Sequence, residues 1–596
     1  MAKYAIIAVN PTIGDWEGQV DIVKRAIADA KKDGVDVLIF PELAIGAPDA
    51  GDLYLRPDTA LSAENALAKI APLTAGITLV IGAPILHNQK MYNTATVFCD
   101  GALAAIVPKR YPAFHVTEER WFARWDFKRT ESHQGASFGA LMTRVKGLEN
   151  ADIIVGAVED YPMPENGKTY VILHNRPYAL GAYREELARH MEYSRAFSLT
   201  LIRANILGSD DGHMIYDGGG YILNLGQLIA LAPRFTFNKD YVVTPMGNHL
   251  PKSFDPTLGH FDRVGSSPKT EEDYAFAELE IALCLGLNDY LRRAHVNKLC
   301  LALSGGRDSA MVAILAARML AITNPDTPPD DLRKKMKEFL VSAYLPSQSS
   351  SSSGTQKAAV ALARHFGFDC PVIPISALSN QIAASIESAI RRKLTWENDD
   401  LTLQNVQARM RSTYIWTLAN ANNALLLTTG NLSESAVGYM TMDGDSSGCL
   451  APIANIPKSL INTWLEWARK FHKIDVLELV FAQPPSAELR PSAAKQADET
   501  DLMPYTALDS FVQWFIVEKL SPREVFLRAK SYLANHYKTD DALKSDIRKF
   551  IALATKSQWK RVRSANGFHV MPFDICASAL QWPCIQDPFT AACRDL

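Results

Sequence analysis

The segment Leu301–Ser309 (LALSGGRDS) constrains the fold more than any other stretch of the chain. Its first residues are apolar and fit a buried β-strand, and the run Ala310–Leu320 predicts a helix directly after the turn. Between them, Gly305 and Gly306 let the backbone turn tightly and approach a ligand, because neither carries a Cβ atom. The N–H groups of such a turn, together with a helix N-terminus, form an anion site. The segment therefore predicts an α/β domain that binds phosphate groups.

Side chains of the same turn supply further groups that a phosphate site needs. Ser304 and Ser309 offer hydroxyl donors. A carboxylate repels phosphate, so we expect Asp308 to hold a Mg²⁺ ion that the phosphates share.

Length and composition are those of a globular protein with two or three domains. The chain has 596 residues, of which 47% are apolar and 21% charged, which excludes a disordered or fibrous chain. With 62 Lys and Arg against 65 Asp and Glu, the net charge is −3, so we expect neither a nucleic-acid partner nor a membrane surface. The eight cysteines show no paired spacing, so no disulfide framework or zinc site is predicted. We expect a cytoplasmic protein without a membrane span.

The first part of the chain alternates short apolar runs with helical patterns. Tyr4–Val9 and Val35–Phe40 read as strands, and Gln19–Lys32 between them has apolar residues at helical spacing. A further helix is expected over Ser62–Ile70, with Ser62 as its N-cap. This alternation predicts an α/β sandwich.

Polar, turn-rich sequence over residues 251–273 predicts a linker between two domains, residues 1–250 and residues 274–596. In the second domain a strand is expected over Phe339–Leu345. The serine run Gln348–Gly354 follows it, and we interpret this run as a mobile loop whose place after a strand suits an active-site lid.

Several separate blocks of the second domain resemble those of a known family, in the same order. The S-G-G-x-D-S turn resembles that of the ATP pyrophosphatases, which split ATP into AMP and pyrophosphate. The later blocks are NVQARMR (405–411), LLLTTGNLSESAVGY (425–439), MDGD (442–445), PIANIPK (452–458) and PPSAEL (484–489). Together they resemble the NAD synthetases over about residues 280–565. The resemblance implies a Rossmann-like, adenine nucleotide alpha hydrolase-like parallel sheet and ATP-dependent amidation of nicotinic acid adenine dinucleotide through an adenylated intermediate.

The resemblance also implies roles for individual residues. The pyrophosphate loop would comprise Ser304, Gly305, Gly306, Asp308 and Ser309. Contacts with ATP are implied for Arg409 and Thr429, and Mg²⁺ ligands are implied to be Asp308 and Glu434. Asp445 and Lys458 match positions around the nicotinate carboxylate and the adenylate, and with Asp308 they are the implied catalytic residues. The serine run is less varied and less basic than the matching loop of the family. The family pairs its synthetase domains, which implies a homodimer or a larger homo-oligomer.

Residues 1–245 resemble the nitrilase-type glutaminase domain fused to many NAD synthetases, which implies an αββα sandwich. That family attacks an amide with a Cys thiolate, aided by a Glu base and a Lys that stabilises the oxyanion. Glu42 and Lys109 match the last two, but the Cys position falls on Val158 within IIVGAVED (153–160). Cys99 is the only cysteine before residue 284 and belongs to an earlier strand. Because a valine side chain has no nucleophilic electrons, we expect a degenerate glutaminase domain that retains its fold. Glu42 and Lys109 would then be kept as a structural ion pair, with a retained non-catalytic binding pocket as the alternative.

Three functions remain open at this point. The first is an NAD synthetase that takes ammonia directly or from a separate glutaminase. The second is an enzyme of the same superfamily that acts on another carboxylate, which Arg307 and the serine run leave open. The third is a non-catalytic scaffold for an active NAD synthetase. The acidic and basic residues kept in the second domain favour an enzyme.

Overall fold

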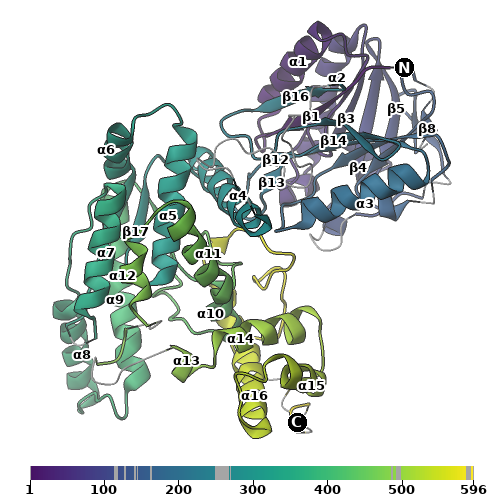
Figure 1. Ribbon diagram of the computed structural model, residues 1–596. Helices are drawn as coiled ribbons and strands as arrows, with labels where there is room; N and C mark the ends of the chain where they lie inside the picture. Colours follow the sequence, from purple (N-terminus) through teal and green to yellow (C-terminus); the bar gives the residue numbers. More distant parts are fainter. Residues whose placement is uncertain are drawn as a thin grey trace. The chain divides into compact units, whose positions relative to one another are not determined.

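The chain forms two compact units, Met1–Gly265 and Ser266–Leu596, which are drawn in the computed structural model of Figure 1. The structure describes residues 2–112, 118–126, 129–139, 142–143, 145–161, 164–247, 268, 270–348, 350–484, 488–491, 498–584, 589, 592–594 and 596. Most of the predicted linker, residues 251–267 and 269, lies outside this part. Its last residues, 271–273, already form the first turn of helix α4 (Glu271–Arg293).

Two β-sheets packed face to face make up the first unit. The larger sheet contains, in spatial order, β16 (Tyr241–Pro245), β1 (Tyr4–Val9), β2 (Val37–Ile39), β3 (Thr78–His87), β4 (Lys90–Cys99), β5 (Ala102–Pro108), β7 (Ala136–Phe138) and β6 (Glu131–His133). The other contains β15 (Gln227–Leu231), β14 (Tyr221–Asn224), β11 (Thr200–Asn205), β10 (Thr169–His174), β9 (Ala151–Val155) and β8 (Met142–Thr143). A small hairpin pairs β12 (Leu207–Gly208) with β13 (Tyr216–Asp217). Ile6 and Val97 of the larger sheet pack against Val171 and Ile202 of the other.

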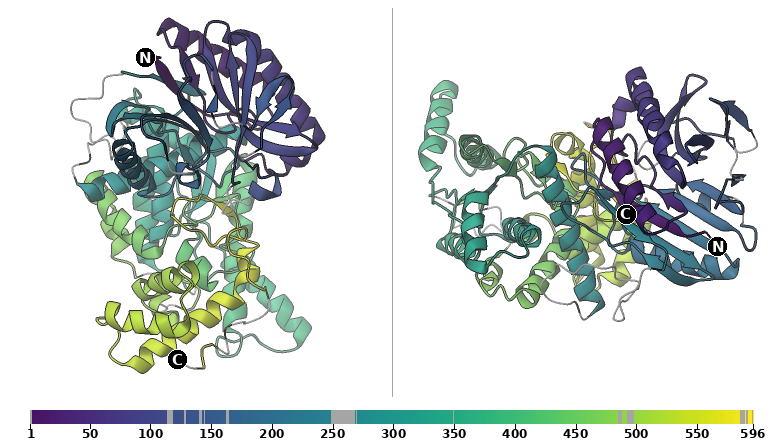
Figure 2. Two further views of the ribbon diagram at one scale, coloured as in Figure 1. Left: turned by 90° about the vertical axis from the view of Figure 1, so that its right-hand side faces the viewer. Right: turned by 90° about the horizontal axis from the view of Figure 1, so that it is seen from above.

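Helices cover the outer faces of both sheets (Figure 1, Figure 2). α1 (Trp16–Lys32) and α2 (Pro57–Ile70) pack on the larger sheet, and α3 (Ala182–Ala196) packs on the other. The predicted αββα sandwich is therefore confirmed. The predicted start of α2 is wrong: the helix begins at Pro57, whose fixed φ suits a first helical turn, so Ser62 lies inside it.

A five-stranded parallel sheet forms the centre of the second unit, which confirms the predicted Rossmann-like fold. Its spatial order is β18 (Leu340–Ala343), β17 (Leu299–Ala302), β19 (Leu425–Leu427), β20 (Leu450–Ala451) and β21 (Asn566–Gly567). Helix α9 (Asp400–Ala421) packs its Ile415 and Ala419 on one face, against Cys300 and Leu426. The other helices are α5 (Arg307–Thr323), α6 (Pro329–Phe339), α7 (Ser353–Phe366), α8 (Ser376–Ile390), α9 itself (Asp400–Ala421), α10 (Leu432–Val437), α11 (Lys458–Phe471), α12 (Leu477–Phe481), α13 (Asp498–Asp501), α14 (Tyr505–Phe511), α15 (Pro522–Tyr532), α16 (Asp540–Lys556) and α17 (Gln558–Arg561).

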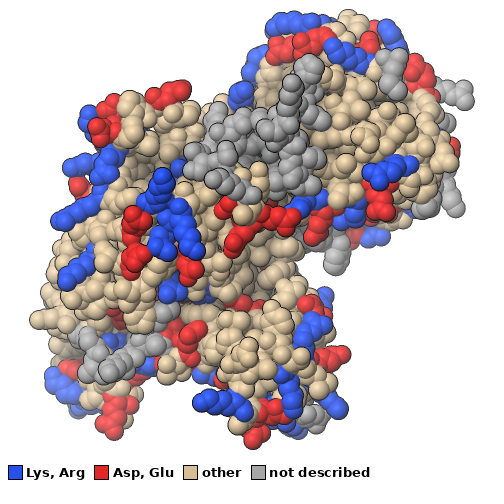
Figure 3. All heavy atoms as spheres, viewed as in Figure 1, with Lys and Arg blue, Asp and Glu red and all other residues tan. Residues whose placement is uncertain are grey.

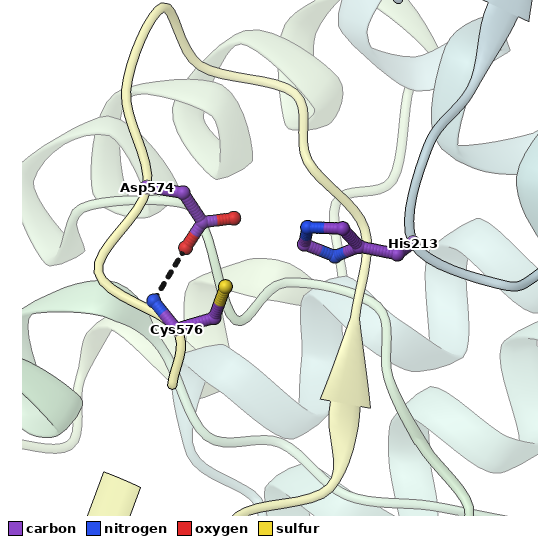
Figure 4. A group of neighbouring side chains, drawn as sticks. All are labelled: His213, Asp574 and Cys576. Carbon is purple, nitrogen blue, oxygen red and sulfur yellow. Dashed lines mark hydrogen bonds between the residues drawn. The ribbon is translucent and has the colours of Figure 1, made fainter. Parts of the chain in front are cut away.

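Hydrogen bonds hold the segment after β21 in place within the second unit. The side chain of Asn455 donates to the carbonyl of Phe573 (2.8 Å). The backbone N–H of Cys576 donates to Asp574 Oδ1 (2.8 Å), which closes a turn (Figure 4).

Basic and acidic side chains are interspersed on the face drawn in Figure 3, as the near balance of charge in the sequence leads one to expect. Among the helices of the described residues, none is both long and apolar enough to cross a bilayer.

Candidate functional site

A cavity of about 450 Å³ opens at the carboxyl ends of β17, β18 and β19 in the second unit. Its lining includes a residue one or two positions beyond the end of each strand: Ser304 after β17, Tyr344 after β18 and Thr429 after β19. Because β18 and β19 lie on opposite sides of β17, the strand order reverses there. Open parallel sheets bind their ligands at such a reversal, outside the carboxyl ends of the strands.

The glycine turn is shaped by the chain that packs behind it. Gly305 has φ 81°, and a Cβ there would collide with the carbonyl of Thr355, so only glycine fits. The buried hydroxyl of Ser309 donates to the Gly306 carbonyl (3.1 Å) and lies 3.0 Å from the Ser304 hydroxyl. Ser309 thus holds the loop, whereas Ser304 and Gly306 line the cavity. No side chain caps the N-terminus of α5, which leaves its first N–H groups for an anion.

Three of the predicted site residues meet at the same edge of the cavity. Lys458, the first residue of α11, donates through Nζ to Asp308 and lies 3.5 Å from Glu434 Oε1. The amide of Asn431 donates to Asp308 Oδ1 (3.1 Å), and its oxygen accepts the backbone N–H of Glu434 (2.9 Å). Asn431 thus caps α10 and orients Asp308. Two carboxylates from different helices therefore converge on one cation.

Electrostatics in this cluster leave room for further positive charge. Burial raises the pKa of Glu434 to about 8, the Lys458 ammonium opposes that shift, and the carboxylate of Asp308 adds to it. For Lys458 burial would lower the pKa, but Asp308 and Glu434 outweigh burial and raise it. Lys458 is therefore charged at neutral pH, and its ammonium lies between the carboxyl groups of Asp308 and Glu434. Carboxylate oxygens are the ligands that Mg²⁺ prefers, so this donor set fits the ion.

The two arginines of the NVQARMR block lie on different faces of α9. Arg409 is exposed, donates to the Met442 carbonyl (3.2 Å) and is not among the residues that line the cavity. Arg411 lines the cavity and donates to the carbonyls of Leu345 (3.1 Å) and Glu488 (3.3 Å). The residues of α9 at the cavity repeat at helical spacing. They are Ala408, Arg411, Ser412 and Ile415.

The remaining predicted residues of the second unit also face the cavity. Thr429 lines it, as does Asp445, whose Oδ1 accepts the backbone N–H of Thr441 (2.7 Å). Part of the predicted serine loop is helical, because Ser352 caps α7 and the helix begins at Ser353. Sequence reasoning missed Asn431, although its place three residues before a glutamate, where it could cap a helix, was a usable signal.

A second charged cluster lies inside the first unit. Lys109, which follows β5, donates through Nζ to Glu42 Oε1 (2.6 Å) and to Glu118 Oε2 (2.8 Å). Asn93 of β4 donates to Oε1 of both glutamates at 2.6 Å. Glu118 and Asn93 were not predicted, because nothing in their local sequence marks them. The predicted ion pair between Glu42 and Lys109 is therefore part of a buried triad, in which Lys109 also contacts Glu118.

Burial sets the protonation of this triad. It raises the pKa of Glu42 to about 7, a shift that Lys109 opposes and Glu118 strengthens. For Lys109 burial would lower the pKa, but the two carboxylates raise it. Oε2 of Glu42 is buried without a hydrogen-bond partner among the described residues. The first unit thus keeps a base of near-neutral pKa beside a permanent cation.

The residue beside this cation is a glycine. Gly156 follows β9 with φ 98°, and a Cβ there would lie 2.9 Å from Lys109 Cε. Val158 is buried, and its side chain packs with Tyr170 and other apolar residues beneath α3. Cys99 ends β4, six residues from Asn93, which corresponds to about 20 Å along a strand. None of these three positions offers a thiol to Glu42 and Lys109.

Both units match known families. Residues 280–561 match the family described as NAD synthase, and residues 3–141 match the family described as carbon-nitrogen hydrolase. The second unit is therefore an NAD synthase domain, and the first contains a carbon-nitrogen hydrolase domain.

Several relatives match nearly the whole chain. It is 29% identical over 591 residues to the glutamine-dependent NAD(+) synthetase of Synechocystis sp., which covers 96% of both chains. It is 28% identical over 557 residues to the enzyme of that name from Thermotoga maritima, covering 88% of this chain and 90% of that one. The crystal structure of the glutamine-dependent NAD(+) synthetase from Cytophaga hutchinsonii superposes with a TM-score of 0.83 at 29% identity, over 100% of this chain and 99% of that chain. The chain belongs to the two-domain NAD synthetases, which are carbon–nitrogen ligases.

Proposed function

We propose that the second unit amidates nicotinic acid adenine dinucleotide to NAD at the expense of ATP. The nicotinate carboxylate would attack the α-phosphorus of ATP, pyrophosphate would leave, and ammonia would then displace AMP from the adenylate. The observation that carries this proposal is the Asp308–Glu434–Lys458 cluster beside the open N-terminus of α5, within the segment that matches NAD synthases. The test is the formation of NAD, AMP and pyrophosphate in equal amounts from nicotinic acid adenine dinucleotide, ATP and ammonium.

In this proposal the glycine turn binds the phosphates that leave. The N–H groups of α5 and the hydroxyl of Ser304 would contact the pyrophosphate oxygens. Asp308 and Glu434 would hold Mg²⁺, and Asn431 would keep the Asp308 carboxylate in place. When bound, the ion offsets the negative charge that develops on the leaving group. Thr429 would contact ATP from the end of β19.

Asp445 and Lys458 are proposed to act on the acceptor and the adenylate. Lys458 projects from the start of α11 and is charged, so its ammonium suits the nicotinate carboxylate as that group approaches. Asp445 lines the cavity, with one oxygen fixed by the N–H of Thr441 and its side chain open to solvent. An open carboxylate can accept a proton or hydrogen bond from the incoming amine.

We further propose that this chain uses ammonia, taken directly or from a separate glutaminase, and does not hydrolyse glutamine itself. Its relatives are named for glutamine dependence, but here neither Gly156 nor Val158 is a cysteine. Cys99, at the end of β4, lies too far along the strand from Asn93 to reach Glu42 and Lys109. Glu42 could at best activate water, and general base catalysis contributes about 10²–10⁴-fold, against the ~10⁶-fold or more expected of an enzyme.

The decisive measurement is NAD formation with ammonium or glutamine as the sole nitrogen donor. We expect activity with ammonium and no glutamate release from glutamine. The Val158→Cys variant is a suitable control and should also release none, because the side chain at 158 packs beneath α3 rather than beside Lys109. Robust glutamate release by the natural protein would refute this proposal.

A homodimer is proposed from the surface of α8. Of its 15 residues only Ser379 is buried, while Leu378, Ile386 and Ile390 are exposed by 38%, 46% and 44%. With Ile382 these side chains repeat every four residues and form one apolar stripe. A second copy of the chain would cover such a stripe. Light scattering of the natural protein and of an Ile386→Asp variant would test this, with a monomeric natural protein as the contrary result.

A further inference from the structure

Arg307 lines the cavity but has no part in the chemistry described so far. It is the first residue of α5, next to the glycine turn. Its guanidinium lies 5.7 Å from the centre of the Phe481 ring, a cation–π distance. Its Nε is shielded from solvent and has no hydrogen-bond partner among the described residues. The ring thus positions a guanidinium whose N–H donors remain free for a ligand.

The other cations at the cavity are already engaged. Lys458 contacts two carboxylates. Arg490 forms ion pairs at 2.9 and 2.8 Å with two aspartates. Arg411 donates to two backbone carbonyls. Within the described lining, Arg307 is therefore the cation that has neither a hydrogen bond nor an ion pair to the protein.

The serine segment that lines the same cavity contributes no charge. Ser350 donates to Gln407 (2.9 Å), and Ser352 caps α7. Ser351 accepts the backbone N–H of Ser347 (3.0 Å). These hydroxyls hold their own segment in place. A polyphosphate bound at the glycine turn would thus face neutral hydroxyl groups at the serine segment and a free guanidinium at Arg307.

We propose that Arg307 binds the terminal phosphates of ATP and the pyrophosphate that they become. This rests on the proposed ATP chemistry of the second unit. The first N–H groups of α5 and the Arg307 side chain belong to the same helical turn, so one anion could contact both. A guanidinium offers two parallel N–H donors in one plane to two phosphate oxygens, whereas an ammonium is a point charge without this geometry. Arg307 should therefore discriminate pyrophosphate and ATP from AMP.

Calorimetric titration of the full-length protein can test this binding without catalysis. The ligands are pyrophosphate, ATP and AMP, each with Mg²⁺. Arg307→Gln should weaken pyrophosphate and ATP by about 10–100-fold, the range for one charge-assisted hydrogen-bonded contact, and leave AMP unchanged. Arg307→Lys should fall between this variant and the natural protein. Lys357→Gln, which removes an exposed charge of α7 that does not line the cavity, should leave all three affinities unchanged.

Unchanged binding of pyrophosphate and ATP by Arg307→Gln would overturn the proposal, as would an equal loss for AMP. If Arg307→Gln fails to fold, Arg307→Lys decides in the same way, by weakening pyrophosphate but not AMP. A natural protein that binds pyrophosphate through Arg307 but forms no NAD would refute the proposed reaction and leave the Arg307 assignment standing. A natural protein that binds neither ATP nor pyrophosphate would overturn both.

Discussion

Replacement of Lys109 by methionine should destabilise the first unit more than most single substitutions. The ammonium lies 2.6 Å from Glu42 and 2.8 Å from Glu118, and the three side chains are 5%, 0% and 5% exposed. Methionine is of similar length but leaves two buried carboxylates without a cation. Breaking a buried ion pair in this way costs about 3–5 kcal/mol, a large share of the ~5–15 kcal/mol that stabilises a domain.

The stability of the first unit should fall as the pH rises, because of the shifted pKa of Glu42. The pKa of Glu42 rises from 4.5 to about 7 on folding, chiefly because of burial. The folded state therefore favours the protonated form, so the contribution of Glu42 is full below pH 4.5 and is lost as the pH rises through about 7. A shift of this size corresponds to about 3 kcal/mol at 1.36 kcal/mol per pKa unit. In Lys109→Met the opposing charge is gone, so the loss should continue above pH 7.

Urea denaturation at several pH values would measure these effects, with hydrogen exchange of β2, β4 and β5 peptides assigning the transition to the first unit. Asp21→Ala, which breaks an ion pair exposed by 45% and 58%, should change stability by less than ~1 kcal/mol. At a pH high enough to ionise Glu42 in Lys109→Met, adding Glu42→Gln should restore part of the loss, because one buried charge remains instead of two. A double variant less stable than Lys109→Met alone would refute the reasoning.

Further predictions concern the second unit. Asp308→Ala should abolish cleavage of ATP to AMP and pyrophosphate with the fold intact, and near-normal turnover of this variant at saturating Mg²⁺ would contradict the metal-ligand role. Asn431→Ala, which frees the Asp308 side chain and removes the cap of α10 but keeps both carboxylates, should lower kcat less. Asp445→Asn and Lys458→Met should raise the KM for the acceptor or lower kcat while ATP binding is retained; a collapse of ATP affinity with acceptor binding intact would reverse these roles. With ammonium as donor, turnover should rise with pH, because only the deprotonated amine has a free electron pair, and a flat profile would argue against direct use of ammonia.

The glycine turn could be predicted from sequence because its causes are local. Strand, turn and helix are adjacent in Leu301–Ser309, and the anion site follows from the backbone alone. The same holds for two strands of the first unit. β1 has the predicted bounds, and β2 lies inside the predicted run Val35–Phe40. The start of α2 was missed because Pro57 extends the helix beyond the apolar pattern that begins near Ser62.

Residues that act across long sequence separations could not be predicted in this way. Asn93 bonds Glu42, which is 51 residues away, and Glu118 joins them from a short helical turn. The choice between Arg409 and Arg411 depends on which face of α9 meets the sheet, and two residues along a helix turn the side chain by about 200°. Only the packing of the helix decides which guanidinium reaches the cavity.

The two units contain the same arrangement of charged side chains, but its role differs between them. Each places a buried lysine between two carboxylates: Lys109 with Glu42 and Glu118, and Lys458 with Asp308 and Glu434. In the first unit both carboxylates are at most 5% exposed, and Gly156, which lies beside Lys109, carries no nucleophile. In the second they are 17% and 21% exposed, at a cavity next to an uncapped helix N-terminus. The charges are alike, but only the carboxylates of the second cluster are open to a ligand. We therefore assign a structural role to the first cluster and a catalytic role to the second.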